Sequence, residues 1–69
     1  MDETRIYTDE ILLRASDVAK QLNISRALAY RLIHTGEIPV VRINHAVRVK
    51  PSDLREFIRR CQQGLNREQ

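Results

Sequence analysis

The chain has 69 residues, enough for one small domain, and its single cysteine cannot form an intramolecular disulfide. It carries a net charge of +3 at pH 7, no apolar run near the roughly 20 residues of a membrane-spanning helix, and an acidic start that is unlike a signal peptide. These features argue against a secreted or membrane-spanning protein and predict a cytoplasmic one.

The positive charge is concentrated in the middle of the chain. Residues 1–13 sum to −3, residues 14–50 to +5 and residues 51–69 to +1, and ten of the twelve basic residues are arginine. An ordinary solvated surface can carry such an excess, and so can a protein with a polyanionic partner. Arginine suits such a partner well, because its guanidinium group pairs with phosphates and with guanine edges.

The N-terminal residues 1–10 show neither helical nor strand periodicity. We therefore expect a flexible acidic arm, with Tyr7 as the residue that could hold it to the body of the domain. Residues 11–13 (Ile-Leu-Leu) form the first apolar run and are expected to enter the core.

A first helix is predicted over residues 15–22. The apolar residues that share one of its faces are Val18, Ala19 and Leu22. Its N-cap is either Ser16, or Arg14 with Asp17 at the third helical position.

A second helix is predicted from Arg26 to about Thr35. Ser25 is a strong N-cap, and Gly36 supplies the left-handed residue that ends a helix. The apolar side of its helical wheel consists of Ala29, Leu32, Ile33 and Gly36. The opposite side consists of Ala27, Tyr30, Arg31 and His34, with Arg26 and Leu28 on the flanks. A helix with a purely structural surface would more often carry Glu–Lys pairs, and this helix has no acidic residue before Glu37.

The turn at residues 23–25 joins the two helices closely. Two short helices joined by a tight turn, the second one basic, are typical of a DNA-binding helix-turn-helix.

A β-hairpin is predicted over residues 40–49, where apolar residues alternate after Pro39 has ended the helical region. We expect a three-residue loop, Asn44-His45-Ala46, with Asn44 or its neighbour in the left-handed conformation. This register pairs Arg42 with Arg48, Ile43 with Val47 and Val41 with Val49. The two opposed arginines repel, which a bound phosphate or a nearby carboxylate would relieve. A two-residue loop would instead place Arg48 on the face of Ile43.

A last helix is predicted from Pro51, which suits a first helical position, while Ser52 and Asp53 suit the first turn. Its apolar stripe consists of Leu54, Phe57, Ile58 and Cys61, with Leu65 as an extension. We expect Cys61 to fill the core, Arg59 and Arg60 to form a solvated helix end, and Gly64 to end the helix.

The predicted fold is mainly α with a small β-hairpin: a winged helix-turn-helix of helix, recognition helix, two-stranded wing and C-terminal helix. The predicted organisation is an acidic arm over residues 1–10, the domain over residues 11–63, and a frayed tail over residues 64–69.

Short motifs stand in a characteristic order along residues 12–60. They are Leu12-Leu13, Asp17-Val18-Ala19, Leu22 to Arg26, Tyr30 to Ile33, Gly36 to Pro39, Val41 to Ile43, Val47 to Val49, Asp53-Leu54 and Phe57-Ile58. Each is weak alone, but the ordered set with these spacings resembles the excisionase family of small DNA-binding proteins. That family shares the winged helix-turn-helix fold of the MerR-like superfamily.

The resemblance implies that the second helix enters the major groove and that the wing touches the backbone or the adjacent minor groove. Members include phage and transposon excisionases, recombination directionality factors that bend DNA and set the direction of an integrase. Other members are small transcription regulators. Members of the family tend to bind repeated sites cooperatively, side by side.

The chain departs from the family pattern at three places. The family often has Thr at the position of Arg14, and small hydroxyl residues at those of Ala27 and Leu28, where contact with thymine methyl groups is the natural substitute. It favours Gly-Arg-Arg where this chain has the wing tip Asn44-His45-Ala46. The grip of the wing is therefore expected to be weaker or, through His45, pH-dependent.

The residues predicted to contact DNA lie on the second helix and the wing. They are Ser25, Arg26, Ala27, Leu28, Tyr30, Arg31, His34, Arg42, Asn44, His45 and Arg48. For Leu28 the alternative is burial against the wing, and for His34 an ordinary surface position. A metal site at His34 and His45 is not expected, because the lone cysteine lies on a different helix.

No catalytic set, phosphate-binding loop or cofactor motif occurs, so we expect neither an enzyme nor a cofactor. The expected partner is double-stranded DNA, together with an integrase and neighbouring copies of the protein on DNA in the case of an excisionase. A transcription regulator remains open, as does a protein-binding adapter that docks an acidic partner. The chain ends soon after Gly64 without a long coiled coil, so we expect a monomer in the absence of DNA.

Overall fold

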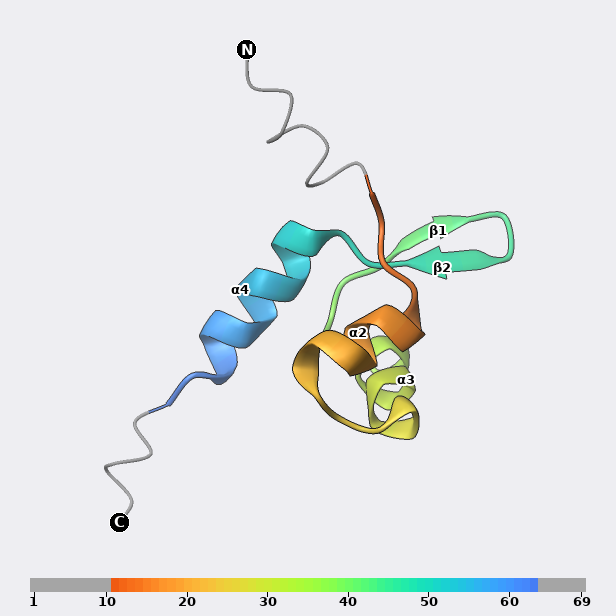
Figure 1. The fold of residues 1–69 in the computed structure, drawn as a ribbon. Helices are drawn as coiled ribbons and strands as arrows, with labels where there is room; N and C mark the ends of the chain where they lie inside the picture. Colours follow the sequence, from red (N-terminus) through yellow and green to blue (C-terminus); the bar gives the residue numbers. More distant parts are fainter. Residues whose placement is uncertain (1–10, 64–69) are drawn as a thin grey trace.

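The computed structural model describes residues 11–63 of the chain. The expectations for Tyr7, Gly64, Leu65, the N-terminal arm and the tail lie outside the described residues. The elements in chain order are α2 (Ala15–Leu22), α3 (Arg26–His34), β1 (Val41–Ile43), β2 (Ala46–Arg48) and α4 (Pro51–Cys61). Figure 1 shows α2 and α3 close together, the hairpin extending to one side and α4 to the other. The described chain is therefore mainly helical with a two-stranded antiparallel hairpin, which confirms the predicted winged helix-turn-helix.

Local capping chemistry sets the ends of α2 and α3. The backbone N–H of Arg14 donates to the Asp17 carboxylate at 3.0 Å, so Arg14 rather than Ser16 is the N-cap of α2. The Ser25 hydroxyl oxygen accepts from the backbone N–H of Leu28 at 3.1 Å, as predicted for the start of α3. Gly36, with φ of +85°, follows the end of α3 in the predicted left-handed conformation.

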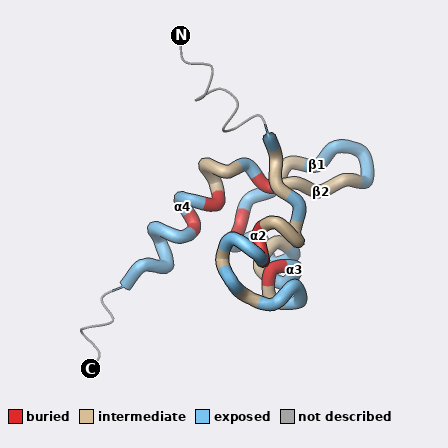
Figure 2. The backbone as a smooth tube through the Cα atoms, viewed as in Figure 1, coloured by how far each residue is buried: buried red, intermediate tan, exposed pale blue. Residues whose placement is uncertain are grey.

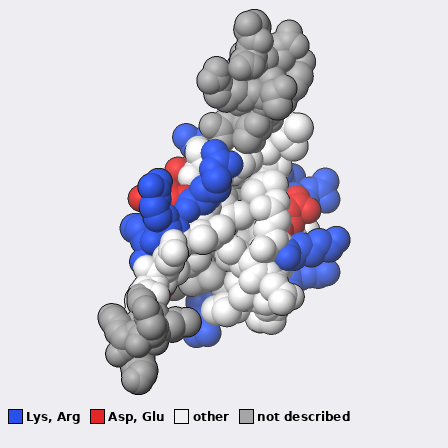
Figure 3. Space-filling model, turned by 60° about the vertical axis from the view of Figure 1, so that its left-hand side comes forward, with Lys and Arg blue, Asp and Glu red and all other residues white. Residues whose placement is uncertain are grey.

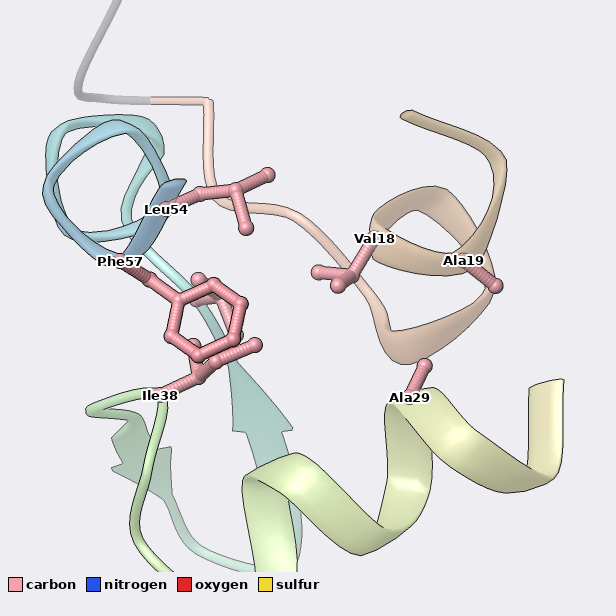
Figure 4. Close-up of a cluster of buried hydrophobic side chains, with 7 residues drawn as sticks. Val18, Ala19, Ala29, Ile38, Leu54 and Phe57 are labelled. Carbon is pink, nitrogen blue, oxygen red and sulfur yellow. The ribbon is translucent and has the colours of Figure 1, made fainter. Parts of the chain in front are cut away.

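The core lies where α2, α3, α4 and the segments between them meet. Its buried side chains are Val18, Ala19, Ala29, Ile38, Val49, Leu54 and Phe57. Figure 4 shows Leu54 and Phe57 of α4 pointing toward the space that Ile38 and Val18 also enter. Complete burial of a Val, Leu, Ile or Phe side chain contributes about 1.5–3 kcal/mol, so these few residues carry much of the stability of so small a domain.

The hairpin has a different register from the predicted one. Its strands pair Val41 with Arg48, Arg42 with Val47 and Ile43 with Ala46. The loop therefore has two residues, Asn44 and His45, and the predicted three-residue loop with Arg42 opposite Arg48 is wrong. The left-handed conformation expected of Asn44 is present, with φ of 57°.

A contact from outside the hairpin accounts for this register. Val49 pairs with Leu13 in an isolated antiparallel bridge, in which each backbone N–H donates to the other residue's carbonyl oxygen at 2.8 Å. Val49 is fully buried there and has left the pairing with Val41 that the alternation predicted. Ile43 near the tip is 52% exposed, so the core does not select which face of the hairpin tip is apolar.

Two expectations about apolar residues are also wrong. Ile11 is 66% exposed, whereas Leu13 of the same run packs against the core. In α4, Leu54 and Phe57 are buried, but Ile58 is 44% exposed and Cys61 is exposed, so Cys61 does not fill the core. Figure 2 shows the difference along α4: buried positions occur in its first two turns, and the end of the helix after Phe57 is exposed.

Candidate nucleic-acid interface

The outward face of α3 carries the side chains that the helical wheel placed there. Ala27, Tyr30, Arg31 and His34 are all exposed, and Tyr30 has 57% of its surface accessible. The opposite side of α3 is fixed against α2 through Ala29, which is completely buried. Figure 4 shows the Ala29 side chain directed toward α2. The small residue lets the two helices approach closely, and the rigid packing holds the outward face in a fixed orientation.

A hollow of about 560 Å³ connects this helix to the wing. It is lined by the start of α2, one flank of α3 and the residues from His45 to Arg48. It brings together the side chains of Arg14, Arg26, His34, His45 and Arg48. None of the described residues that line it is acidic, and the Asp17 carboxylate lies close by, 3.0 Å from the backbone nitrogen of Arg14. The three arginines give the hollow itself a positive potential.

The first turn of α2 contributes to the same hollow through Ala15 and Ser16. Backbone N–H groups in the first turn of a helix lack intrahelical partners, and the helix dipole adds partial positive charge there. An anion in the hollow would therefore meet three arginines together with this helix end.

The two arginines of the wing lie in different surroundings. The guanidinium Nη1 of Arg48 donates to the Val47 carbonyl oxygen at 2.9 Å, and Arg48 is half-buried in the hollow. Arg42 pairs with Val47 and is exposed, and the alternation of a strand directs it to the face opposite Arg48. The predicted phosphate clamp between Arg42 and Arg48 is thus not formed, whereas Arg48 joins the arginines of α2 and α3.

The remaining residues predicted to contact DNA lie at the start of α3, at the wing tip and in a groove beside α4. Ser25 is exposed at the start of α3, and Asn44 and His45 are exposed at the wing tip. Leu28 is half-buried and lies beside Leu32 in an apolar groove against α4, away from the wing. Burial of Leu28 against the wing, the alternative drawn from the sequence, is therefore wrong.

Sequence reasoning missed the contribution of Arg14 and Ser16 to the hollow. Both were considered only as candidate caps of α2. The available signal was that Arg14 and Ser16 stand at the start of α2. Because α2 packs against α3, its start lies next to the same surface.

Sequence reasoning also missed a structural role of Arg60. Its guanidinium donates to the Glu37 carbonyl oxygen at 3.1 Å and lies 6.0 Å from the centroid of the Phe57 ring. It thereby ties α4 to the segment that follows α3, rather than serving only as a solvated helix end.

The described part of the chain contains no cluster of three or more His, Cys, Asp or Glu side chains arranged to hold a metal ion. His34 and His45 line the same hollow, but none of the described residues beside them there is an Asp, Glu or Cys. Within residues 11–63, no helix has the length and apolar character needed to cross a membrane.

Comparison with known proteins agrees with this architecture. A family described as "Helix-turn-helix domain" matches residues 12–62. Two proteins of Mycobacterium tuberculosis, from strains CDC 1551 / Oshkosh and ATCC 25618 / H37Rv, are each 34% identical over 47 residues, and both names begin "Putative DNA-binding protein". The aligned part covers 68% of this chain and 60% of each relative. No solved structure gives a significant match. With the match extending from Leu12 through α4, the chain belongs to the helix-turn-helix domain family.

Proposed function

We propose that the protein binds double-stranded DNA sequence-specifically, with the outward face of α3 in the major groove and the wing against the backbone. The observation that carries the proposal is the hollow in which Arg14, Arg26 and Arg48 come together from three elements without an acidic lining residue. The names of the two mycobacterial relatives support the same conclusion.

The positions of the side chains suggest a division of labour. Arg31 lies on the outward face of α3 and outside the hollow, so it is our candidate to read a guanine edge, with Ala27 beside it for a thymine methyl group. Arg14, Arg26 and Arg48 are candidates for phosphate oxygens, as is the exposed hydroxyl of Ser25. Tyr30 and His34 lie between these two sets and suit backbone or base contacts.

The wing completes the proposed interface. Asn44 and His45 at its tip are exposed. Their side chains are short, so the wing tip can approach the DNA backbone or the edge of the minor groove. Arg42, on the other face of the hairpin, would reach a neighbouring phosphate only at longer range.

Within this function we propose an excisionase-like role, in which several copies bind adjacent sites, bend DNA and direct an integrase. The ordered motifs shared with the excisionase family support it, and residues 11–63 form the unit that would bind each site. A small transcription regulator with the same fold is the alternative. The two differ in whether the DNA bends and whether an integrase depends on the protein.

Selection of binding sites from a random double-stranded DNA pool tests the basic proposal. We expect a defined motif whose affinity exceeds that for scrambled DNA by about 10³-fold or more at physiological salt. If no motif is enriched and all sequences bind with equal affinity, the protein binds DNA non-specifically and the proposal of sequence-specific binding is wrong. Absence of DNA binding even at low salt would favour the adapter.

A further inference from the structure

A second hollow, a groove of about 470 Å³, lies on the other flank of α3. Its lining is apolar and includes Leu22, Ile24, Leu28, Leu32, Phe57 and Ile58. Of the described residues that line it none is charged, and it shares no residue with the hollow beside the wing. Ile58 and the neighbouring Cys61 are exposed here, so the end of α4 presents apolar surface that the described chain leaves uncovered.

Basic side chains surround this apolar groove. Arg55 and Arg59 lie with Ile58 around one adjoining depression, and Arg60 lies with Phe57 and Cys61 around another. Figure 3, with α4 turned toward the viewer, shows Lys and Arg side chains gathered at both edges of an uncharged surface. Two acidic residues also lie here: Glu37 lines the same depression as Arg60, and the Glu56 carboxylate pairs with Arg59 at 3.2 Å.

The apolar lining and the surrounding arginines together indicate what kind of segment could bind in the groove. Apolar side chains would fill the groove, and carboxylates would meet the surrounding arginines. A second copy that presented the same groove would bring two sets of arginines together, which like-charge repulsion disfavours.

The chain itself contains a segment with this chemistry. Residues 1–10 carry Asp2, Glu3, Asp9 and Glu10 against a single arginine, and between the acidic pairs stand Ile6 and Tyr7. No stretch of ten residues elsewhere in the sequence carries as large a net negative charge.

The start of the described chain also lies within reach of the groove. Leu13 is hydrogen-bonded to Val49, just before the first residue of α4. The 11 residues of α4 extend about 16 Å at 1.5 Å per residue. Ile11 is the first described residue, and the five residue steps from it back to Ile6 span up to about 17 Å when extended, which is comparable with the length of α4.

We propose that residues 1–10 dock into this groove, with Ile6 and Tyr7 on the apolar lining and the carboxylates among the arginines of α4. The docking covers the apolar end of α4 within one molecule and leaves the hollow beside the wing open. It does not depend on DNA binding. A covalently linked segment is present at an effective concentration of roughly millimolar, so a weak contact suffices to occupy the groove.

The side chain of Cys61 provides a reporter, because it is the only cysteine of the chain and lines the groove. We would measure its alkylation rate by iodoacetamide, an uncharged reagent, in the full chain. In the double variant Ile6→Ser with Tyr7→Ser the rate should rise about threefold or more, because the docked segment no longer shields the thiol. The matched control, Thr4→Ser with Thr8→Ser, should keep the parent rate.

Nuclear Overhauser effects between the Tyr7 ring and the methyl groups of Leu28, Leu32 or Ile58 supply the direct structural test. We expect them in the parent at low salt and at every protein concentration. Their absence, together with equal alkylation rates in parent and double variant, would overturn the proposal. If the protection of Cys61 from alkylation increased with protein concentration, the groove would instead bind residues 1–10 of a second copy. A DNA affinity that rose about tenfold in the double variant would place the arm on the DNA-binding face, also against the proposal.

Discussion

The guanidinium groups of Arg42 and Arg48 are directed to opposite faces of the wing. Arg48 is held in the hollow by its hydrogen bond to the Val47 carbonyl, next to the surface formed by Arg14 and Arg26. Arg42 has no place in that hollow. A residue fixed next to other cations loses little conformational entropy when it binds a phosphate, so the two arginines should contribute unequally to DNA binding.

We therefore expect Arg48→Ala to flatten the plot of log K against log salt concentration by about 0.9, the value for one lost phosphate contact. Arg42→Ala should flatten it by less than half as much. Fluorescence anisotropy titrations over a range of KCl concentrations measure both slopes. Arg55→Ala, on α4 and away from the wing, is the control with an unchanged slope. Equal effects of Arg42 and Arg48 would contradict the placement of the two side chains.

The two flanks of α3 predict different effects on sequence preference. Arg31→Ala should cost about 1–3 kcal/mol in binding and relax one base position, because a guanine contact is lost. Leu28→Thr should lower stability and leave the motif unchanged, because Leu28 lies in the groove against α4. Binding-site selection with both variants distinguishes these outcomes. A changed base preference of the Leu28→Thr variant would instead support the contact between Leu28 and a thymine methyl group that the sequence predicts.

At the scale of elements, the sequence predicted what local chemistry determines. Ser25, Gly36 and Pro51 begin or end their helices as expected, because caps depend on neighbours within one turn. The hairpin register was wrong because Val49 pairs with Leu13, a partner far away in sequence. Periodicity identified the apolar stripe of α4 but could not show that the core ends before Cys61, since the length of a core depends on what packs against the helix.

The candidate site, like the elements, was predictable only where local sequence determines it. The outward face of α3 follows from helical periodicity alone, and the structure has it as predicted. The meeting of Arg14, Arg26 and Arg48 was not predictable, because it depends on how α2, α3 and the hairpin are arranged in space.

The segment between α3 and β1 contributes one completely buried side chain to the core, that of Ile38, in the same cluster as Leu54 and Phe57 of α4. We expect Ile38→Ala to lower the free energy of unfolding by about 2–5 kcal/mol, from the lost burial and the cavity left behind. Val40→Ala, at a neighbouring position that is 36% exposed, should change it by less than about 1 kcal/mol. Urea unfolding followed by circular dichroism measures both, and similar losses would mean that the core does not depend on Ile38.

On the scale of the whole molecule, we expect one domain of this size to be unable to bend DNA sharply by itself. A smooth bend over 20–30 base pairs costs roughly 1–6 kcal/mol, which several adjacent copies can share. In the proposed excisionase-like role, the cost of the bend is shared only by copies on adjacent sites, so we expect association between copies to depend on DNA.

Binding to phased repeats tests this assembly. Two or three sites spaced by one helical turn should bind cooperatively and migrate as bent DNA in circular-permutation gel shifts, whereas one site should bend little. Sedimentation velocity at micromolar concentration should show a monomer without DNA. A stable dimer without DNA, or independent binding to straight DNA, would favour the transcription regulator.

The backbone bridge between Leu13 and Val49 has a consequence for the order of folding. It closes a chain segment that contains both helices of the helix-turn-helix and the whole hairpin. Because closure of a long loop costs entropy before it yields contacts, α2 and α3 should form first and the bridge last. Once closed, it ties the segment before α2 to the base of the hairpin. The amides of Leu13 and Val49 should then exchange with deuterium only through global unfolding, whereas the amides at the hairpin tip should exchange through local opening.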